Sequence, residues 1–269
     1  MKTHTMVSLS CLVALLLAAP GCQKLKARDS LNRGVQAYKN ARYPEAVEHF
    51  KIAVDLDPEF PTARLYLATA YMSQYIPGAE STENLRMAKA AFDEFNKVLE
   101  RDSKNGIALA SIATMHFHQK KFDESEAWYK KLVEADPKNR EGYYTLGVIA
   151  WTKTFQKRME ARAKLGMQPD DPGPLKDKKV REQIREQNWP VIEAGLAQLN
   201  LALGVDPEYD DAMAYINLLL RERADLQDTS EAYKKDSEEA DGWIQKTLET
   251  KKIKALRAPS GGIITEEVK

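Results

Sequence analysis

The chain has 269 residues, of which 40 are basic and 40 acidic, so its formal net charge at neutral pH is zero. A chain without overall positive charge has no general electrostatic attraction for nucleic acid, and a nucleic-acid partner is not expected. The charges are nonetheless unevenly spread. Residues 152–189 hold ten basic and six acidic side chains, whereas residues 205–250 hold five basic and thirteen acidic ones. Both segments could simply be solvated helix faces.

Residues 1–21 have the pattern of an export signal. Lys2 precedes an apolar run over residues 7–19, which is too short to cross a bilayer about 30 Å thick. The run ends at residues 19–22, Ala-Pro-Gly-Cys, which resemble the lipobox of bacterial lipoproteins. This resemblance implies cleavage before Cys22 and lipidation of that cysteine. Ordinary secretion and cleavage is the alternative.

The same resemblance predicts how the chain is held. The other cysteine, Cys11, lies in the segment that would be removed, so a mature chain would contain no disulfide. Residues 22–26 would form the lipidated terminus and a short tether. By resemblance to the sorting rule of enteric bacteria, Gln23 in place of Asp favours the outer membrane, with the chain facing the periplasm or exposed on the surface.

Beyond residue 26, one short motif recurs where a helical pattern ends. It is an acidic residue followed by proline, or once by serine, at Asp57-Pro58, Asp102-Ser103, Asp136-Pro137 and Asp206-Pro207. The second residues of the four copies are 45, 34 and 70 positions apart. A repeat of 34 residues with two insertions, of 11 and 36 residues, accounts for these distances.

Each interval carries small and aromatic residues at spacings that suit a pair of packed helices. The first interval has them at Gly34, Tyr43, Ala46, Phe50, Ala53 and Pro58. These positions closely resemble those of the tetratricopeptide repeat (TPR) family. The resemblance implies an all-α fold, a TPR-type solenoid of about five helical hairpins over residues 27–251. No run of alternating β-branched residues suggests a strand.

The repeats divide the chain into successive units. They are expected at residues 27–60, 61–105 with an insertion at 74–84, 106–139, 140–209 with an insertion at 152–189, and 210–251 as a capping unit. In the third unit, Ala113 and Ser125 are the small residues where the two helices must approach closely. Residues 252–269 are expected to form a flexible tail.

The shorter insertion, residues 74–84, contains Tyr75 and Ile76 in a segment interrupted by proline and glycine. We expect an irregular loop here, with Ser81 as the cap of the next helix. The two apolar side chains could form an exposed adhesive tip, or they could fold down on their own repeat.

The longer insertion, residues 152–189, predicts that both helices of the fourth unit are lengthened. About 14 residues on each side of a proline-rich loop give a protruding antiparallel arm about 21 Å long, at 1.5 Å per residue. Gly166 is expected to end the first arm helix in a left-handed conformation, and Pro190 to kink or break the returning helix. Such an arm could bind a partner or brace the solenoid.

The sequence shows no constellation typical of an enzyme. His116 and His118 are two residues apart on a predicted helix, so their side chains point about 200° apart and cannot share a metal ion. We expect His116 to pack between helices and His118 to face the groove or solvent. No phosphate-binding loop and no nucleophile with a neighbouring base occurs, so neither enzyme activity nor a metal or cofactor is expected.

The family resemblance also implies where a partner would bind. TPR arrays hold a peptide or a helix on the inner face of each first helix. The corresponding partner-binding groove here consists of Tyr38, Met72, Phe117, His118, Tyr144 and Trp151. Aromatic residues are favoured at binding surfaces because they bury a large area for few frozen torsions. The alternative is that several of them belong to the core of adjacent repeats.

These patterns predict a membrane-anchored adaptor that binds a protein partner in the bacterial cell envelope, in assembly, secretion or pilus biogenesis by analogy with known TPR lipoproteins. The alternative is a lipoprotein that stacks glycans or peptidoglycan fragments on the same rings. Glycan binding requires polar side chains around the rings, whereas the neighbours of Phe117 and Trp151 are mainly apolar or small. The sequence does not indicate an oligomeric state.

Overall fold

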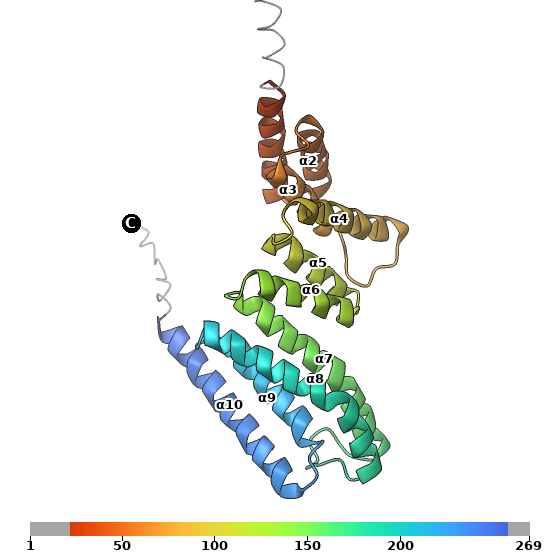
Figure 1. Ribbon diagram of the computed structural model, residues 1–269, viewed down its shortest axis with the longest axis vertical. Coiled ribbons are helices and arrows are strands. Elements are labelled where there is room, and N and C mark those ends of the chain that lie inside the picture. Colours follow the sequence, from red (N-terminus) through yellow and green to blue (C-terminus); the bar gives the residue numbers. More distant parts are fainter. Residues whose placement is uncertain (1–21, 258–269) are drawn as a thin grey trace, which may run out of the picture. The chain divides into compact units, whose positions relative to one another are not determined.

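The computed structural model describes residues 22–257, and every regular element in that range is a helix (Figure 1). The expected export signal at residues 1–21 and the last part of the expected tail, residues 258–269, lie outside the described residues. The chain forms two compact units, which meet in sequence between Ala135 and Asp136. None of the described helices combines the length and the apolar character needed to cross a membrane.

The N-terminal unit begins with a helix over residues 22–39. It continues with α2 (Tyr43–Leu56), α3 (Pro61–Met72), α4 (Thr82–Arg101), α5 (Gly106–His118) and α6 (Phe122–Ala135). From α2 to α6, each helix packs on the next one along the chain, as expected for successive helical hairpins. The predicted close approach in the third hairpin is confirmed, because the fully buried Ser125 hydroxyl donates a hydrogen bond of 2.9 Å to the carbonyl of Ala113.

The C-terminal unit consists of α7 (Arg140–Lys164), α8 (Lys178–Val205), α9 (Asp210–Ala224) and α10 (Ser230–Arg257). Helix α7 packs on α8, α8 on α9, and α9 on α10, so the all-α prediction of paired helices is confirmed in this unit as well.

Two predicted irregular segments are helical instead. Helix α10 continues through residues 252–257, where the tail was expected, and Lys254 and Arg257 form ion pairs there with Asp210, the first residue of α9, and with Glu208 just before it. Residues 22–26, the expected tether, belong to the first helix. No glycine or proline interrupts the chain there, and Ala27 is fully buried one residue later.

The recurring acidic residue ends one helix and starts the turn into the next, as the repeat pattern predicts. Asp57, Asp102 and Asp206 are the C-caps of α2, α4 and α8, and Asp136 directly follows α6. In all four copies, the aspartate carbonyl accepts a 3.0 Å hydrogen bond from the backbone N–H three residues later. Proline suits the position after the aspartate because the turn requires no N–H there.

The residue three positions after each aspartate occupies the N-cap position of the following helix. Asn105 and Asn139 each accept a hydrogen bond from a backbone N–H in the first turn of α5 and α7, which satisfies one of the free donors of a helix start. Phe60 and Tyr209 occupy the same place before α3 and α9, where they pack as aromatic side chains rather than cap. The repeat therefore fixes a boundary, and its chemistry varies between units.

Glycines stand where paired helices touch. A Cβ atom at Gly34 would lie 2.4 Å from the ring of Phe50 on α2, and one at Gly147 would lie 2.4 Å from Leu199 on α8. Gly195 of α8 meets α7 and α9 at similarly short range. Since non-bonded carbon atoms stay about 3.5–4.0 Å apart, a larger residue at these positions would push the helices apart. The close packing expected at Gly34 from the repeat pattern is thus confirmed.

The lengthened hairpin of the fourth unit is present, with α7 reaching Lys164 and α8 starting at Lys178. Gly166 has φ +66° directly after the end of α7, as predicted. Pro190 does not break the returning helix, because α8 runs through it without interruption. The surrounding packing, with Ile192 fully buried, maintains the helix despite the lost hydrogen bond.

The arm does not protrude freely, which corrects the prediction. Its tip folds onto the end of α9, and the Leu175 N–H donates a 2.9 Å hydrogen bond to the carbonyl of Asp225. Arg162, which is 2% exposed, donates to both carboxylate oxygens of Asp225 at 2.8 Å and to the carbonyls of Gln168 and Asp171 in the tip loop. This one guanidinium therefore fastens the tip to α9, so the arm braces its own unit.

Further ion pairs join the basic arm to the acidic segment that follows it. Arg158 lies 2.9 Å from a carboxylate oxygen of Glu222 and 2.7 Å from one of Asp225, and Arg185 pairs with Asp228. Part of the basic charge of residues 152–189 is thus paired with acidic residues inside the C-terminal unit. These paired side chains are not simply solvated helix faces. A buried pair of this kind is costly to break, because the remaining partner stays charged and desolvated.

We predict that Arg162→Met lowers the free energy of unfolding of the C-terminal unit by about 3–5 kcal/mol, because Asp225 loses a buried partner and two tip carbonyls lose their donor. Urea denaturation followed by tryptophan fluorescence measures this change. Lys164→Met, at an exposed position of the same helix, is the matched control and should stay within about 0.5 kcal/mol of the parent. Equal effects of the two substitutions would contradict the bracing role.

A second prediction concerns pH. Burial raises the pKa of the Glu222 carboxyl to about 7 from its ordinary 4.5, although Arg158 opposes the shift. Between pH 4.5 and pH 7, the Glu222 carboxyl therefore holds more protons in the folded chain than in the unfolded chain. The stabilisation of the fold by this protonation is full below pH 4.5 and is lost as the pH rises through 7. Glu222→Gln should remove about 1–3 kcal/mol of the stability difference between pH 5 and pH 8. Parallel pH profiles for parent and variant would refute this assignment.

Candidate functional site

Two of the predicted groove residues hold the N-terminal unit together. The Tyr38 hydroxyl lies 2.9 Å from the Ser73 hydroxyl at the end of α3, and the Tyr38 ring lies 5.2 Å from that of Tyr43. Met72 packs against the buried cluster formed by α3, α4 and α5. Both side chains are half-buried. They join neighbouring helices, so the alternative of core packing accounts for part of the predicted groove.

The other two predicted groove residues of this unit, Phe117 and His118, lie at the end of α5 in different environments. Phe117 is half-buried, and its ring lies 5.5 Å from that of Phe122 at the start of α6. His118 is exposed and points into a cavity. His116 packs between helices, as expected, with its ring 4.9 Å from that of Phe92 on α4. Burial is the main cause that lowers the pKa of His116, and the positive charge of Lys121 lowers this pKa further.

Tyr144 and Trp151 belong to an aromatic cluster of the C-terminal unit. Tyr215 of α9 stands edge-on to both, at 5.5 Å from Tyr144 and 5.7 Å from Trp151. The cluster also includes Phe155, whose ring lies 4.8 Å from that of Trp151, and Tyr209, whose ring lies 5.2 Å from that of Tyr144. Burial raises the pKa of Tyr144 to about 12. These rings contact one another edge-on or tilted, so each is partly covered by its neighbours.

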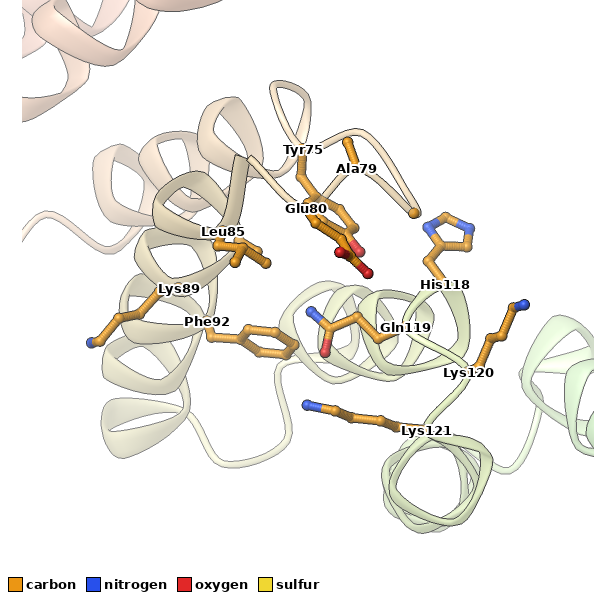
Figure 2. Close-up of a pocket in the computed structure, with 12 residues that line it drawn as sticks. Tyr75, Ala79, Glu80, Leu85, Lys89, Phe92, His118, Gln119, Lys120 and Lys121 are labelled. Atoms are coloured by element: carbon orange, nitrogen blue, oxygen red, sulfur yellow. The ribbon is translucent and has the colours of Figure 1, made fainter. Parts of the chain in front are cut away.

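A cavity of the N-terminal unit lies elsewhere, beside the inserted loop. This cavity of about 670 Å³ opens among residues 75–80, the first half of α4 and the turn between α5 and α6 (Figure 2). We call it the loop pocket. The side chains that define it are Tyr75, Glu80, Leu85, Phe92, His118 and Lys121. Its size falls within the range of ligand-binding clefts in proteins.

The inserted loop is fixed in place by one side chain. The buried Asn84 amide accepts a 2.7 Å hydrogen bond from the Ile76 N–H and donates to the carbonyls of Ile76 and Ala79 at 2.9 and 2.7 Å. Ser81 caps α4, as predicted, by accepting from the backbone N–H of Asn84. Tyr75 packs on its own repeat, whereas Ile76 stays 65% exposed. Of the two predicted alternatives, folding onto the repeat therefore applies to Tyr75 and exposure at the tip applies to Ile76.

The loop pocket combines an apolar wall with a polar opposite side. Figure 2 shows Phe92 and Leu85 on α4 facing Gln119 and Lys121 across the open space. Glu80 points into the same space from the loop. Such a pocket can hold an apolar group and form hydrogen bonds or ion pairs with polar groups beside it. Within residues 22–257, no cluster of His, Cys, Asp and Glu could hold a metal ion.

The structure therefore brings only His118, of the predicted groove residues, into the loop pocket. The sequence did not indicate Phe92, because this residue lies on the second helix of its hairpin and the family pattern places the groove on first helices. It also missed Tyr209 and Tyr215. Tyr209 could have been found, since it occupies the same place after Asp206-Pro207 as Phe60 does after Asp57-Pro58.

Comparison with protein families finds one match in this chain. Residues 31–78 and 83–140 match the family described as tetratricopeptide repeat. The gap between the two matched segments falls within the inserted loop. No curated protein sequence matches the chain.

Solved structures with a similar fold include several of the protein MamA. One MamA crystal structure is 12% identical, covers 87% of this chain and 96% of its own, and has a TM-score of 0.56. MamA from Desulfovibrio magneticus is 16% identical, covers 85% of this chain and 96% of its own, and has a TM-score of 0.54. At this level of identity the likeness concerns the fold alone.

We predict that Asn84→Ala releases the inserted loop, because two carbonyls and one N–H lose their partner. Backbone amides of residues 76–81 should exchange with deuterium at least tenfold faster, and global stability should fall by about 1–3 kcal/mol. Hydrogen-exchange mass spectrometry measures the first effect. Asn96→Ala, at an exposed position of the same helix, is the control. Unchanged exchange in the loop would show that Asn84 does not anchor it.

Proposed function

We propose that this chain, whose residues 31–78 and 83–140 match the tetratricopeptide repeat family, serves as a protein–protein interaction scaffold in the bacterial cell envelope, held on a membrane by lipid at Cys22. The repeat family carries this proposal, because stacked helical hairpins display a broad surface that suits extended peptides and helices. Repeats of this family generally act by binding. We accordingly propose a binding role without enzyme activity.

Aromatic and apolar side chains that remain partly accessible support a protein partner. Tyr144, Trp151 and Tyr215 are half-buried, so each keeps part of its surface for contact with another protein. Partly exposed tyrosine and tryptophan anchored in a rigid helix pair are typical of interface hot spots, since little side-chain entropy is lost on binding. The loop pocket offers a second contact region in the N-terminal unit.

Membrane attachment is proposed from the lipobox-like residues 19–22 and the apolar run before them. Cys22 is exposed and begins the described part of the first helix. Since Ala27 is already part of the core, an acylated Cys22 would hold the first repeat about 8 Å from the lipid attachment point, at 1.5 Å per helical residue. We therefore propose a partner close to the membrane surface, with the outer membrane favoured by Gln23.

The anchor is tested by the mass of the mature amino terminus. We expect a chain that starts at Cys22 and carries acyl groups, and we expect Cys22→Ser to move the protein from the membrane fraction to the soluble fraction. Several acyl chains are needed for firm attachment, because one chain binds only marginally. A mature terminus at another residue, or an unmodified Cys22, would refute lipid anchoring and leave ordinary secretion.

The scaffold role is tested by affinity capture from detergent-solubilised envelopes. The parent chain should retain a defined protein that the double variant Tyr38→Ala/Trp151→Ala loses, with circular dichroism verifying that the variant remains helical. Retention of the same proteins by parent and variant would remove these residues from the interface. Retention of none by the parent would count against the scaffold role itself. Calorimetry with envelope glycans should give no heat of binding.

A further inference from the structure

The loop pocket has a chemical character that defines a class of partner, and the inference rests on the proposed scaffold function. We propose that this pocket binds an acidic segment of a protein partner, which inserts one bulky apolar side chain against α4 and places carboxylates beside the lysines of the α5–α6 turn. Apart from His118, the site lies outside the predicted groove on the first helices, and residues 74–84, which interrupt the repeat, contribute one of its walls.

The apolar part of the pocket is accessible and rigidly held. Leu85 is 54% exposed on α4 and lines the pocket. The Phe92 ring beside it is half-buried and fixed by its contact with His116. A bulky apolar side chain of a partner would cover part of this apolar surface and displace water from it. Burial of one such side chain is typical of the dominant contact in a peptide-binding site.

The charged part of the pocket favours carboxylates. Lys89, Lys120 and Lys121 line the pocket, against one acidic residue, Glu80. Lys89 is already paired with Asp93 at 2.6 Å. Within the residues that the structure describes, Lys120 and Lys121 form no ion pair, and both are exposed. Two unpaired lysines beside an apolar surface attract a partner of opposite charge and disfavour a basic one.

A second cavity of the same unit shows the contrast. This cavity of about 470 Å³ lies among α2, α3 and α4 and also contains three basic residues. Each of them is paired within the chain: Lys51 with Glu48, and both Arg64 and Lys97 with Glu94. Its charges are thus satisfied without a ligand. The loop pocket differs because its lysines at the α5–α6 turn have no such partner.

The wall of the pocket is ordered before a ligand arrives. The three hydrogen bonds of Asn84 hold the loop at residues 76–79, and Lys120 is fixed in the turn with φ 59° and an N–H bonded to the carbonyl of Phe117. A site that needs no loop ordering loses less conformational entropy on binding. The inserted residues therefore form a preformed surface rather than a flexible tip.

The proposal is tested by selection from a phage-displayed library of random twelve-residue peptides on the purified chain. We expect enriched peptides that combine aspartate or glutamate with one Phe, Trp, Leu or Ile. For a synthetic enriched peptide, fluorescence anisotropy should show binding weakened at least tenfold by Leu85→Glu and by Lys120→Glu/Lys121→Glu. Binding should also weaken as salt is added, because exposed charges are screened. The controls Leu201→Glu and Lys104→Glu, exposed and outside the pocket, should leave the affinity unchanged.

Several results would overturn the proposal. Enrichment of basic or uncharged peptides, enrichment of none, or affinities that the pocket variants do not alter would each exclude an acidic ligand at this site. If peptide binding responds to Tyr38→Ala/Trp151→Ala and not to the pocket variants, the scaffold function stands and the pocket assignment falls. If the pocket binds acidic peptides but the chain retrieves no envelope protein, the pocket assignment stands and the envelope role falls.

Discussion

Close packing of paired helices is the constraint on which this fold depends, and in two of the described pairs the contact leaves no room for a Cβ atom. Gly34 against Phe50 and Gly147 against Leu199 bring two helix backbones close enough for a large side chain of one helix to lie on the backbone of the other. Because an amphipathic helix buries only one stripe, such a pair still exposes apolar surface and requires the next pair to cover it. The repeat of small residues is therefore the condition for the stacking of hairpins within each unit.

The elements that follow from local rules could be predicted from the sequence. The aspartate turns set the helix boundaries because their hydrogen bonds join residues only three positions apart, and Gly166 ends α7 for an equally local reason. The position of the arm tip could not be predicted, since it depends on Arg162 and Asp225, which are 63 residues apart. Charge composition indicated a basic and an acidic segment but gave no register in which they would pair.

The candidate site was only partly predictable for the same reason. His118 could be placed from the repeat, because its position on a first helix is set by the 34-residue period. Phe92 and Lys121 line the same pocket because α4 packs on α5, and the inserted loop that forms another wall has no counterpart in the repeat. Tyr38 and Met72 occupy positions that the family uses for binding, yet here they also join neighbouring helices. A family pattern thus locates a face of the helix, and packing decides how much of that face stays accessible.

The two insertions show how departures from a repeat acquire different roles. In the C-terminal unit the added residues are covered: Leu175 is fully buried, and Arg162 and Asp225 satisfy each other inside the unit. In the N-terminal unit, Asn84 satisfies the backbone of the loop but leaves the side chains around it uncovered. An insertion whose polar groups are satisfied within its own unit adds stability. Beside the shorter insertion, Leu85 stays exposed, and Lys120 and Lys121 form no ion pair within the described residues, so contact with another molecule there would be favourable. By this criterion the shorter insertion, rather than the longer arm, is the surface that a partner would recognise.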